Sequence, residues 1–179
     1  MSNSPIRRIL VPIDFTEDVD MAVHSGFEVE IDGAMVGVAP ASAKALELAV
    51  SIVDDGGALC LIHATPTYDG ARIYGGSARL LGANDITEIH ASAREASIKV
   101  LEALAARYAP GLTPEFVVRP GVALSMILDE SERFGADLIV IAASGRGRVA
   151  RFFLGSTADQ VIRQARCPVM IVPPVLIEG

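Results

Sequence analysis

The chain has no tryptophan, and aromatic residues make up only 5% of its 179 positions. Proteins that bind single-stranded nucleic acid stack its bases on aromatic side chains, so this scarcity disfavours that function. Basic residues are also fewer than acidic ones, 15 against 22, and the resulting net charge of −7 repels a phosphate backbone. The composition therefore predicts no nucleic-acid partner.

Long apolar runs and paired cysteines are scarce as well. The longest near-continuous apolar run covers residues 138–143, about a third of the roughly 20 residues that a membrane-spanning helix needs. The two cysteines, Cys60 and Cys167, lie within apolar runs and form no C-x-x-C pair. Such cysteines are typical of small apolar side chains in a reducing compartment. We therefore expect a cytoplasmic protein without a membrane partner.

Apolar residues, in contrast, are abundant: 51% of the chain is hydrophobic, and its mean hydropathy is +0.42. This content excludes intrinsic disorder, which requires low hydrophobicity and high charge. The length suits one ordinary domain and is too short for two well-buried ones. We therefore expect residues 1–179 to form a single domain.

Short apolar runs alternate with helical patterns along the chain. Four runs are apolar on both faces, as in strands buried in a parallel sheet; they lie at residues 9–13, 58–63, 137–142 and 169–172, and a fifth, mixed run lies at 115–119. Between them, the apolar spacing predicts helices at residues 42–54, 84–108, 123–134 and 156–166. The alternation predicts an α/β fold with a single doubly wound, mostly parallel five-stranded open sheet and helices on both faces (Rossmann-like). Ligands of such sheets bind outside the carboxyl ends of the strands, here just after Ile13, His63 and Ala142.

Residues 17–40 do not fit this simple repeat, because they separate the first strand from the first helix by far more than the usual 2–6 residues. Within this insert, residues 27–38 alternate apolar and polar side chains around a central Asp-Gly pair. That pattern predicts a β-hairpin with a two-residue turn. Three interpretations stay open for it: a structural decoration, a surface for self-association or another partner, or a lid over a ligand site.

The strongest local motif reads AASGRGRVARFFLGST over residues 142–157. It follows a predicted strand and ends at the start of a predicted helix. Gly155, Ser156 and Thr157 present backbone N–H groups at the helix N-terminus, where the partial positive charge favours phosphate. Three arginines without an intervening acid add a local positive field. The motif indicates anion binding, and the alternative is a surface turn with solvated arginines and an ordinary helix cap.

Several catalytic and metal motifs are missing from the sequence. There is no G-x-x-x-x-G-K-[ST] loop, no G-x-G-x-x-G after the first strand, no G-x-S-x-G and no H-E-x-x-H. The three histidines share no metal-ligand spacing. We interpret His63 as a structural, hydrogen-bonded residue, and a base or a ligand is the alternative. We therefore predict no catalytic residue and no metal site. Asp14 directly follows the first strand and is a candidate acceptor for a ribose or a base; capping the following turn is the alternative.

Four sequence segments together resemble the universal stress proteins. They are ILVPIDFT at 9–16, LIHA at 61–64, GADLIVIAAS at 135–144, and the glycine-containing loop that ends at Gly155-Ser156-Thr157 and is followed by CPVMIV at 167–172. The resemblance is to UspA-like members, which have the adenine nucleotide α-hydrolase-like fold. It covers the chain apart from the insert at 17–40.

The resemblance implies an ATP site. ATP-binding members carry a glycine, two residues, a second glycine, nine residues, and then Gly-Ser or Gly-Thr. Here the second half is intact, with nine residues between Gly145 and Gly155, whereas Ala142 replaces the first glycine. The implied contacts are phosphates for Gly145, Gly155, Ser156 and Thr157, the ribose for Ala142, and adenine and ribose for Pro12, Asp14, Ala64 and Ile141. Mg²⁺ would be held through the phosphates, and we expect Ala142 to weaken ATP binding without abolishing it.

The resemblance also implies a function and a partner. We expect an ATP-binding, dimeric regulatory protein of the stress response with at most slow ATP hydrolysis, and a homodimer formed through the last strand, Val169–Val172. The alternative is a nucleotide-free dimeric interaction module, in which Ala142 and the insert have weakened or removed the ATP site. An enzyme of the ATP-pyrophosphatase type is disfavoured, because the first strand is not followed by an S-G-G-x-D-S loop.

Overall fold

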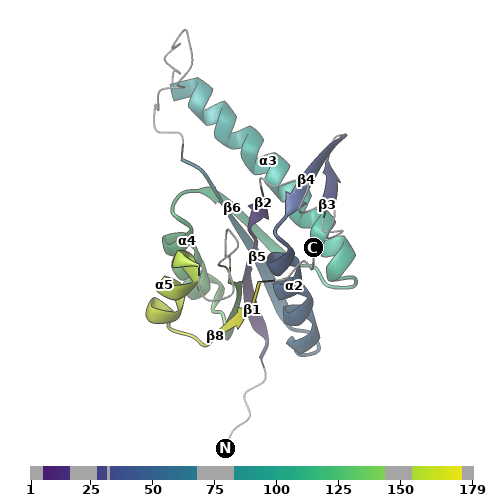
Figure 1. Ribbon diagram of the computed structural model, residues 1–179, viewed down its shortest axis with the longest axis vertical. Helices are drawn as coiled ribbons and strands as arrows, with labels where there is room; N and C mark the ends of the chain where they lie inside the picture. The colour runs from purple at the N-terminus through teal and green to yellow at the C-terminus, as the bar shows by residue number, and fades with distance from the viewer. Residues whose placement is uncertain (1–5, 17–27, 32, 68–82, 144–154, 175–179) are drawn as a thin grey trace, which may run out of the picture.

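The computed structural model describes residues 6–16, 28–31, 33–67, 83–143 and 155–174. These residues form a five-stranded sheet, a smaller three-stranded sheet and four helices (Figure 1). The larger sheet contains β1 (Arg8–Pro12), β5 (Ala58–Thr65), β6 (Glu115–Pro120), β7 (Leu138–Ala142) and β8 (Val169–Val172). The smaller sheet contains β2 (Phe15–Thr16), β3 (Glu28–Ile31) and β4 (Ala34–Val38). The helices are α2 (Pro40–Ile52), α3 (Ala83–Tyr108), α4 (Ala123–Phe134) and α5 (Ser156–Gln164).

The larger sheet has the order β6-β5-β1-β7-β8, and all of its strand pairs are parallel. From β1 in the centre, the chain moves outward through β5 and β6, and then returns to the other side of β1 to form β7 and β8. The direction of winding therefore reverses between β1 and β7. The predicted doubly wound α/β sheet is confirmed.

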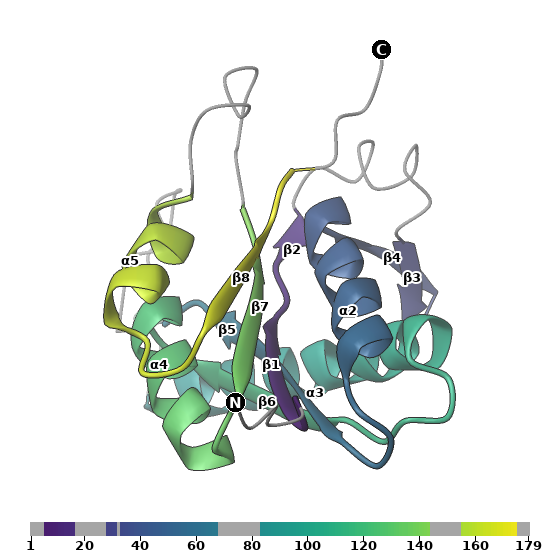
Figure 2. The same cartoon turned by 90° about the horizontal axis from the view of Figure 1, so that it is seen from below.

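Helices cover both faces of this sheet, with α2 and α3 on one side and α4 and α5 on the other (Figure 2). Alternate residues of β1 point to opposite faces: Ile9 and Val11 join the core beneath α2 and α3, whereas Leu10 joins the core beneath α4 and α5. Burial on both faces explains why the strand sequences are continuous apolar runs rather than alternating ones. Among the helices of the described residues, none combines the length and the apolar character needed to cross a membrane.

The two cysteines are free thiols, as their surroundings in the sequence suggested. Cys60 lies fully buried in β5. Burial raises the pKa of its thiol to about 12, so the side chain stays protonated at neutral pH. Cys60 therefore behaves as a small core residue and not as a nucleophile.

The predicted hairpin in the insert is also confirmed. β3 and β4 pair antiparallel from Glu28↔Gly37 to Ile31↔Ala34, and Gly33 in the turn has a φ of 81°, which two-residue hairpin turns favour. Its buried side chains, Val29 and Val38, join the core on the α3 side of the larger sheet. The described strands of the insert thus extend that core beside α3 (Figure 1). Residues 17–27 and 32 of the insert lie outside the described part of the chain, and the expected insert is one residue too long, because Pro40 already begins α2.

Candidate functional site

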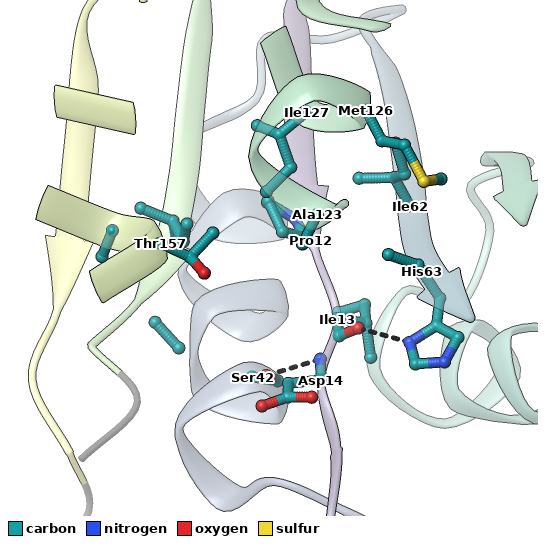
Figure 3. A pocket seen from close by; sticks show the side chains of 14 residues that line it. Pro12, Ile13, Asp14, Ser42, Ile62, His63, Ala123, Met126, Ile127 and Thr157 are labelled. Atoms are coloured by element: carbon teal, nitrogen blue, oxygen red, sulfur yellow. Dashed lines mark hydrogen bonds between the residues drawn. The ribbon is translucent and has the colours of Figure 1, made fainter. Parts of the chain in front are cut away.

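A cavity of about 130 Å³ lies at the carboxyl ends of β1, β5 and β7, next to the point where the winding reverses (Figure 3). Open doubly wound sheets bind their ligands at this place, so the predicted location contains a cavity. The residues that line it are Pro12, Ile13, Asp14, Ser42, Ile62, His63, Ala64, Ala123, Met126, Ile127, Ile141, Ala142, Thr157 and Ala158.

Three helices begin at this edge of the sheet. The first turns of α2, α4 and α5 contribute Ser42, Ala123 and Thr157 to the cavity wall. None of these three helices has a side-chain hydrogen bond at its N-cap. Their N-terminal N–H groups and their dipoles therefore favour a negatively charged ligand group in this region.

The cavity has an apolar part and a polar part. Ile62, Met126 and Ile127 lie together on one side, between β5 and α4, whereas Asp14 and Ser42 lie on another (Figure 3). An apolar wall with a few polar groups is typical of sites for small organic molecules. Among the described residues, no group of three or more His, Cys, Asp or Glu side chains could hold a metal ion.

Asp14 follows β1 and is exposed at the cavity. Its backbone N–H donates to Ser42 Oγ at 3.0 Å, and its carbonyl oxygen accepts from the backbone N–H of Ala39 at 2.9 Å. Both backbone polar groups of Asp14 are therefore held by residues at the start of α2. The carboxylate is presented from a fixed backbone position.

His63 lines the cavity from β5 and holds the neighbouring residue. Its Nδ1 lies 2.9 Å from the carbonyl oxygen of Ile13, and its ring stacks on Phe15 with centroids 3.8 Å apart and an interplanar angle of 16°. Burial lowers the pKa of His63 below its ordinary value, although the bond to Ile13 and the charge of Asp14 act in the opposite direction. The ring is therefore neutral at pH 7. Because a carbonyl oxygen only accepts, the proton is on Nδ1, and Nε2 is a hydrogen-bond acceptor.

Ala142, which replaces the first glycine of the motif that the sequence resembles, is the last residue of β7 and pairs with Val172 of β8. Its backbone is therefore extended, a conformation that any residue adopts without strain. The consequence of the alanine is limited to its methyl group, which lines the cavity.

The structure brings most of the sequence-predicted site residues together. Six of the nine line the cavity: Pro12, Asp14, Ala64, Ile141, Ala142 and Thr157. Gly155 is the N-cap of α5 and Ser156 is its first residue, immediately before Thr157. Gly145 lies outside the described residues, as do the arginines of the loop.

Eight lining residues were not among the predicted site residues: Ile13, Ser42, Ile62, His63, Ala158 and the α4 residues Ala123, Met126 and Ile127. The start of α4 follows a strand of the parallel sheet, so its place at the carboxyl edge follows from topology alone. Ser42 had no comparable signal, because it lies 28 positions after its partner Asp14.

Comparison with known proteins adds a family and a set of similar folds. The sequence profile of the Universal stress protein family matches residues 31–173. Universal stress protein MJ0531 of Methanocaldococcus jannaschii is 42% identical over 52 residues, which are 29% of this chain and 31% of that relative. The aligned segment thus spans less than a third of the relative's length.

Two solved structures share the fold over nearly the whole chain. The universal stress protein UspA from Lactobacillus plantarum has a TM-score of 0.58 at 22% identity, covering 95% of this chain and 99% of that one. A universal stress protein family protein from Arabidopsis thaliana, crystallised with AMP bound, has a TM-score of 0.56 at 16% identity, covering 94% of this chain and 92% of that one. At these identities the likeness establishes the architecture.

Proposed function

The chain belongs to the universal stress protein family, and on that premise we propose that it binds an adenine nucleotide, ATP, in the cavity at the carboxyl ends of β1, β5 and β7. The observation that carries the proposal is that residues far apart in the sequence, Asp14, Ala142 and Thr157, line one cavity. The AMP in the crystals of the Arabidopsis thaliana protein supports the same ligand class.

Each part of the nucleotide has suitable partners in this site. The apolar side chains Ile62, Met126 and Ile127 offer a surface for the adenine ring, and the Asp14 carboxylate offers acceptors for ribose hydroxyl groups. The phosphates are assigned to the start of α5, where Gly155, Ser156 and Thr157 supply N–H groups and hydroxyls. In this proposal, Mg²⁺ binds to the phosphates of ATP.

The same proposal assigns at most slow hydrolysis to the protein. His63 Nδ1 is bonded to Ile13, and its ring is covered on one face by Phe15. These contacts support a structural role for His63 rather than that of a mobile proton acceptor. On the family premise, we propose a nucleotide-linked regulatory protein of the stress response that acts in the cytoplasm.

We further propose a homodimer formed through β8. This strand pairs only with β7 among the described strands and forms an edge of the larger sheet. It carries no charged residue, and Met170 is 36% exposed. An apolar edge strand without charges needs covering, which a second copy supplies. We also propose that residues 1–179 form one domain of the family, with an insertion that begins at residue 17, after β2, and ends where α2 begins at Pro40.

One observation favours the alternative of a nucleotide-free dimeric interaction module. The cavity volume of about 130 Å³ is below the roughly 300–1,000 Å³ of sites that enclose a whole drug-sized ligand. A cavity of this size takes a base or a ribose, and the remaining parts of a nucleotide must then bind outside it.

The first experiment separates the two functions. The full chain is purified and denatured, the released nucleotides are measured by chromatography, and the emptied protein is titrated with ATP in the presence of Mg²⁺. The proposal expects bound adenine nucleotide or a dissociation constant in the micromolar range. An empty protein without a titration signal up to millimolar ATP contradicts it and supports the interaction module.

A further inference from the structure

Every backbone polar group of Ile13 and Asp14 has a hydrogen-bond partner. The N–H of Ile13 donates to the carbonyl of Ile62 at 2.9 Å, and the N–H of Asp14 donates to Ser42 Oγ at 3.0 Å. The carbonyl of Ile13 accepts from His63 Nδ1, and that of Asp14 accepts from the N–H of Ala39, both at 2.9 Å. Two of the four partners are side chains, and both line the cavity (Figure 3).

Ser42 does not cap the N-terminus of α2. A serine at a helix start commonly caps it, accepting a bond from one of the first N–H groups. Here the N-cap of α2 is Ala39, the helix has no side-chain cap bond, and Pro40 fills its first position. Ser42 lies two residues inside the helix, is only 1% exposed, and directs its hydroxyl oxygen to Asp14.

The hydrogen bond from the Asp14 N–H to Ser42 Oγ helps to fix the position of the Asp14 carboxylate. Removal of the hydroxyl frees the Asp14 N–H, so the backbone at the end of β1 loses one of its four fixed contacts. A carboxylate that accepts hydrogen bonds from a ribose must be within about 3 Å of the hydroxyl oxygens. Displacements of about 1 Å in such a group are enough to lose its contribution to recognition.

We propose that Ser42 is a positioning residue that sets the preference of the site for a ribose with its hydroxyl groups, by holding Asp14 through its backbone N–H. The inference rests on the proposed adenine-nucleotide site and adds the residue that determines its sugar selectivity. Ser42 itself does not touch the ligand in this role.

The test compares ATP with 2′,3′-dideoxy-ATP, which lacks both ribose hydroxyls, by titration of the native 179-residue chain and its variants. Hydrogen bonds to a carboxylate predict that the native protein prefers ATP by about tenfold to a hundredfold. Asp14→Ala removes the carboxylate, so the ratio of its affinities for ATP and dideoxy-ATP is the ratio expected without this contact. Ser42→Ala is expected to lower ATP affinity by about tenfold and dideoxy-ATP affinity by less than about twofold, so its ratio approaches that of Asp14→Ala.

Two further variants separate positioning from general damage. Ser42→Thr keeps a hydroxyl and is expected to retain the native ratio. Ser51→Ala removes a serine from the same helix, where its hydroxyl donates to the carbonyl of Leu48 at the exposed face, and leaves both affinities unchanged. Thermal melts of each variant establish that the fold is intact.

The possible outcomes separate a failure of the proposed Ser42 role from a failure of the proposed nucleotide binding. A native protein that binds neither nucleotide overturns both proposals. A native protein that binds the two equally well overturns the sugar preference alone. A Ser42→Ala variant that keeps the native ratio, or that loses both ligands to the same extent, shows that Ser42 does not act through Asp14.

Discussion

Ser42 Oγ accepts a hydrogen bond from the backbone N–H of Asp14 at 3.0 Å, although the two residues lie 28 positions apart. The insert lies between them and is anchored at the same place, since Phe15 of β2 pairs with Val38 of β4 and Ala39 bonds to Asp14. The chain therefore leaves the sheet at β1, forms the hairpin, and returns to the end of β1 before α2 begins.

This arrangement bears on the role of the hairpin. None of the described residues 28–31 and 33–39 of the insert lines the cavity, and β3 packs against α3 instead. The described part of the insert therefore adds to the core and to the outer surface. Its most exposed large apolar side chain is Met35, at 45%.

A negative charge at the start of α5 tests the phosphate assignment. Gly155 has a φ of −56°, which other residues adopt, and aspartate is a favourable N-cap, so Gly155→Asp keeps the helix. The added carboxylate repels phosphate, and we expect ATP affinity to fall by at least about tenfold. Gly155→Asn is the neutral control of nearly equal shape and should change the affinity by less than about threefold. Equal affinities for the two variants in calorimetric titrations would place the phosphates elsewhere.

A glycine at position 142, as in the motif that the sequence resembles, tests the role of Ala142. Since this residue is extended in β7, Ala142→Gly relieves no strain and only removes the methyl group from the cavity wall. We expect ATP affinity to rise by up to about tenfold, while the free energy of unfolding falls by about 0.5–1 kcal/mol, the usual effect of glycine in a strand.

The control for this variant is the next residue. Ala143 is also buried but does not line the cavity, so Ala143→Gly should lower stability without changing ATP affinity. Affinity is measured by titration and stability by denaturant unfolding. A lower ATP affinity in Ala142→Gly would contradict the proposed place of Ala142 beside the ligand.

The fold could be predicted because its local signals agree with its tertiary contacts. Strands such as β7 are buried on both faces, so their sequences are apolar throughout, and the Asp-Gly turn with alternating neighbours identified the hairpin. The site was predictable to the extent that its residues adjoin strand ends or the glycine-containing loop.

The remaining site contacts depend on long-range packing. β2 has only two residues and exists because Phe15 meets Val38 at the base of the hairpin. The bond from Asp14 to Ser42 requires α2 to start against the end of β1, after an insert whose length hides the relationship. No local periodicity or motif carries such information.

His63 provides a pH-dependent contribution to stability. Its pKa is lower in the folded protein than in the unfolded chain, chiefly through burial, so the unfolded chain binds more protons once the pH falls below about 6.5. The contribution is therefore complete above that pH and is lost as the pH falls through the folded-state pKa. From this one group, the free energy of unfolding should fall by up to about 1.4 kcal/mol per pH unit.

Denaturant unfolding between pH 7 and pH 5 measures this effect. His63→Asn keeps a nitrogen that can donate to Ile13 but cannot titrate, so its stability should depend less on pH than that of the native protein. His90→Asn removes an imidazole from α3, outside the cavity, and leaves the His63 contribution in place. If native protein and His63→Asn lose stability in parallel, the buried ring does not titrate as described.

The last prediction concerns the proposed dimer. If a second copy covers β8, a negative charge at Met170 meets the same charge on the partner near the symmetry axis, where removing it from water adds to the repulsion. Met170→Asp should therefore shift the native dimer to a monomer in light scattering at micromolar concentration. Met35→Asp places the same change on a comparably exposed methionine of the hairpin and should leave the dimer intact. The reverse result, a monomer from Met35→Asp and a dimer from Met170→Asp, would move the interface from the edge of the larger sheet to the insert, and would make self-association the role of the hairpin.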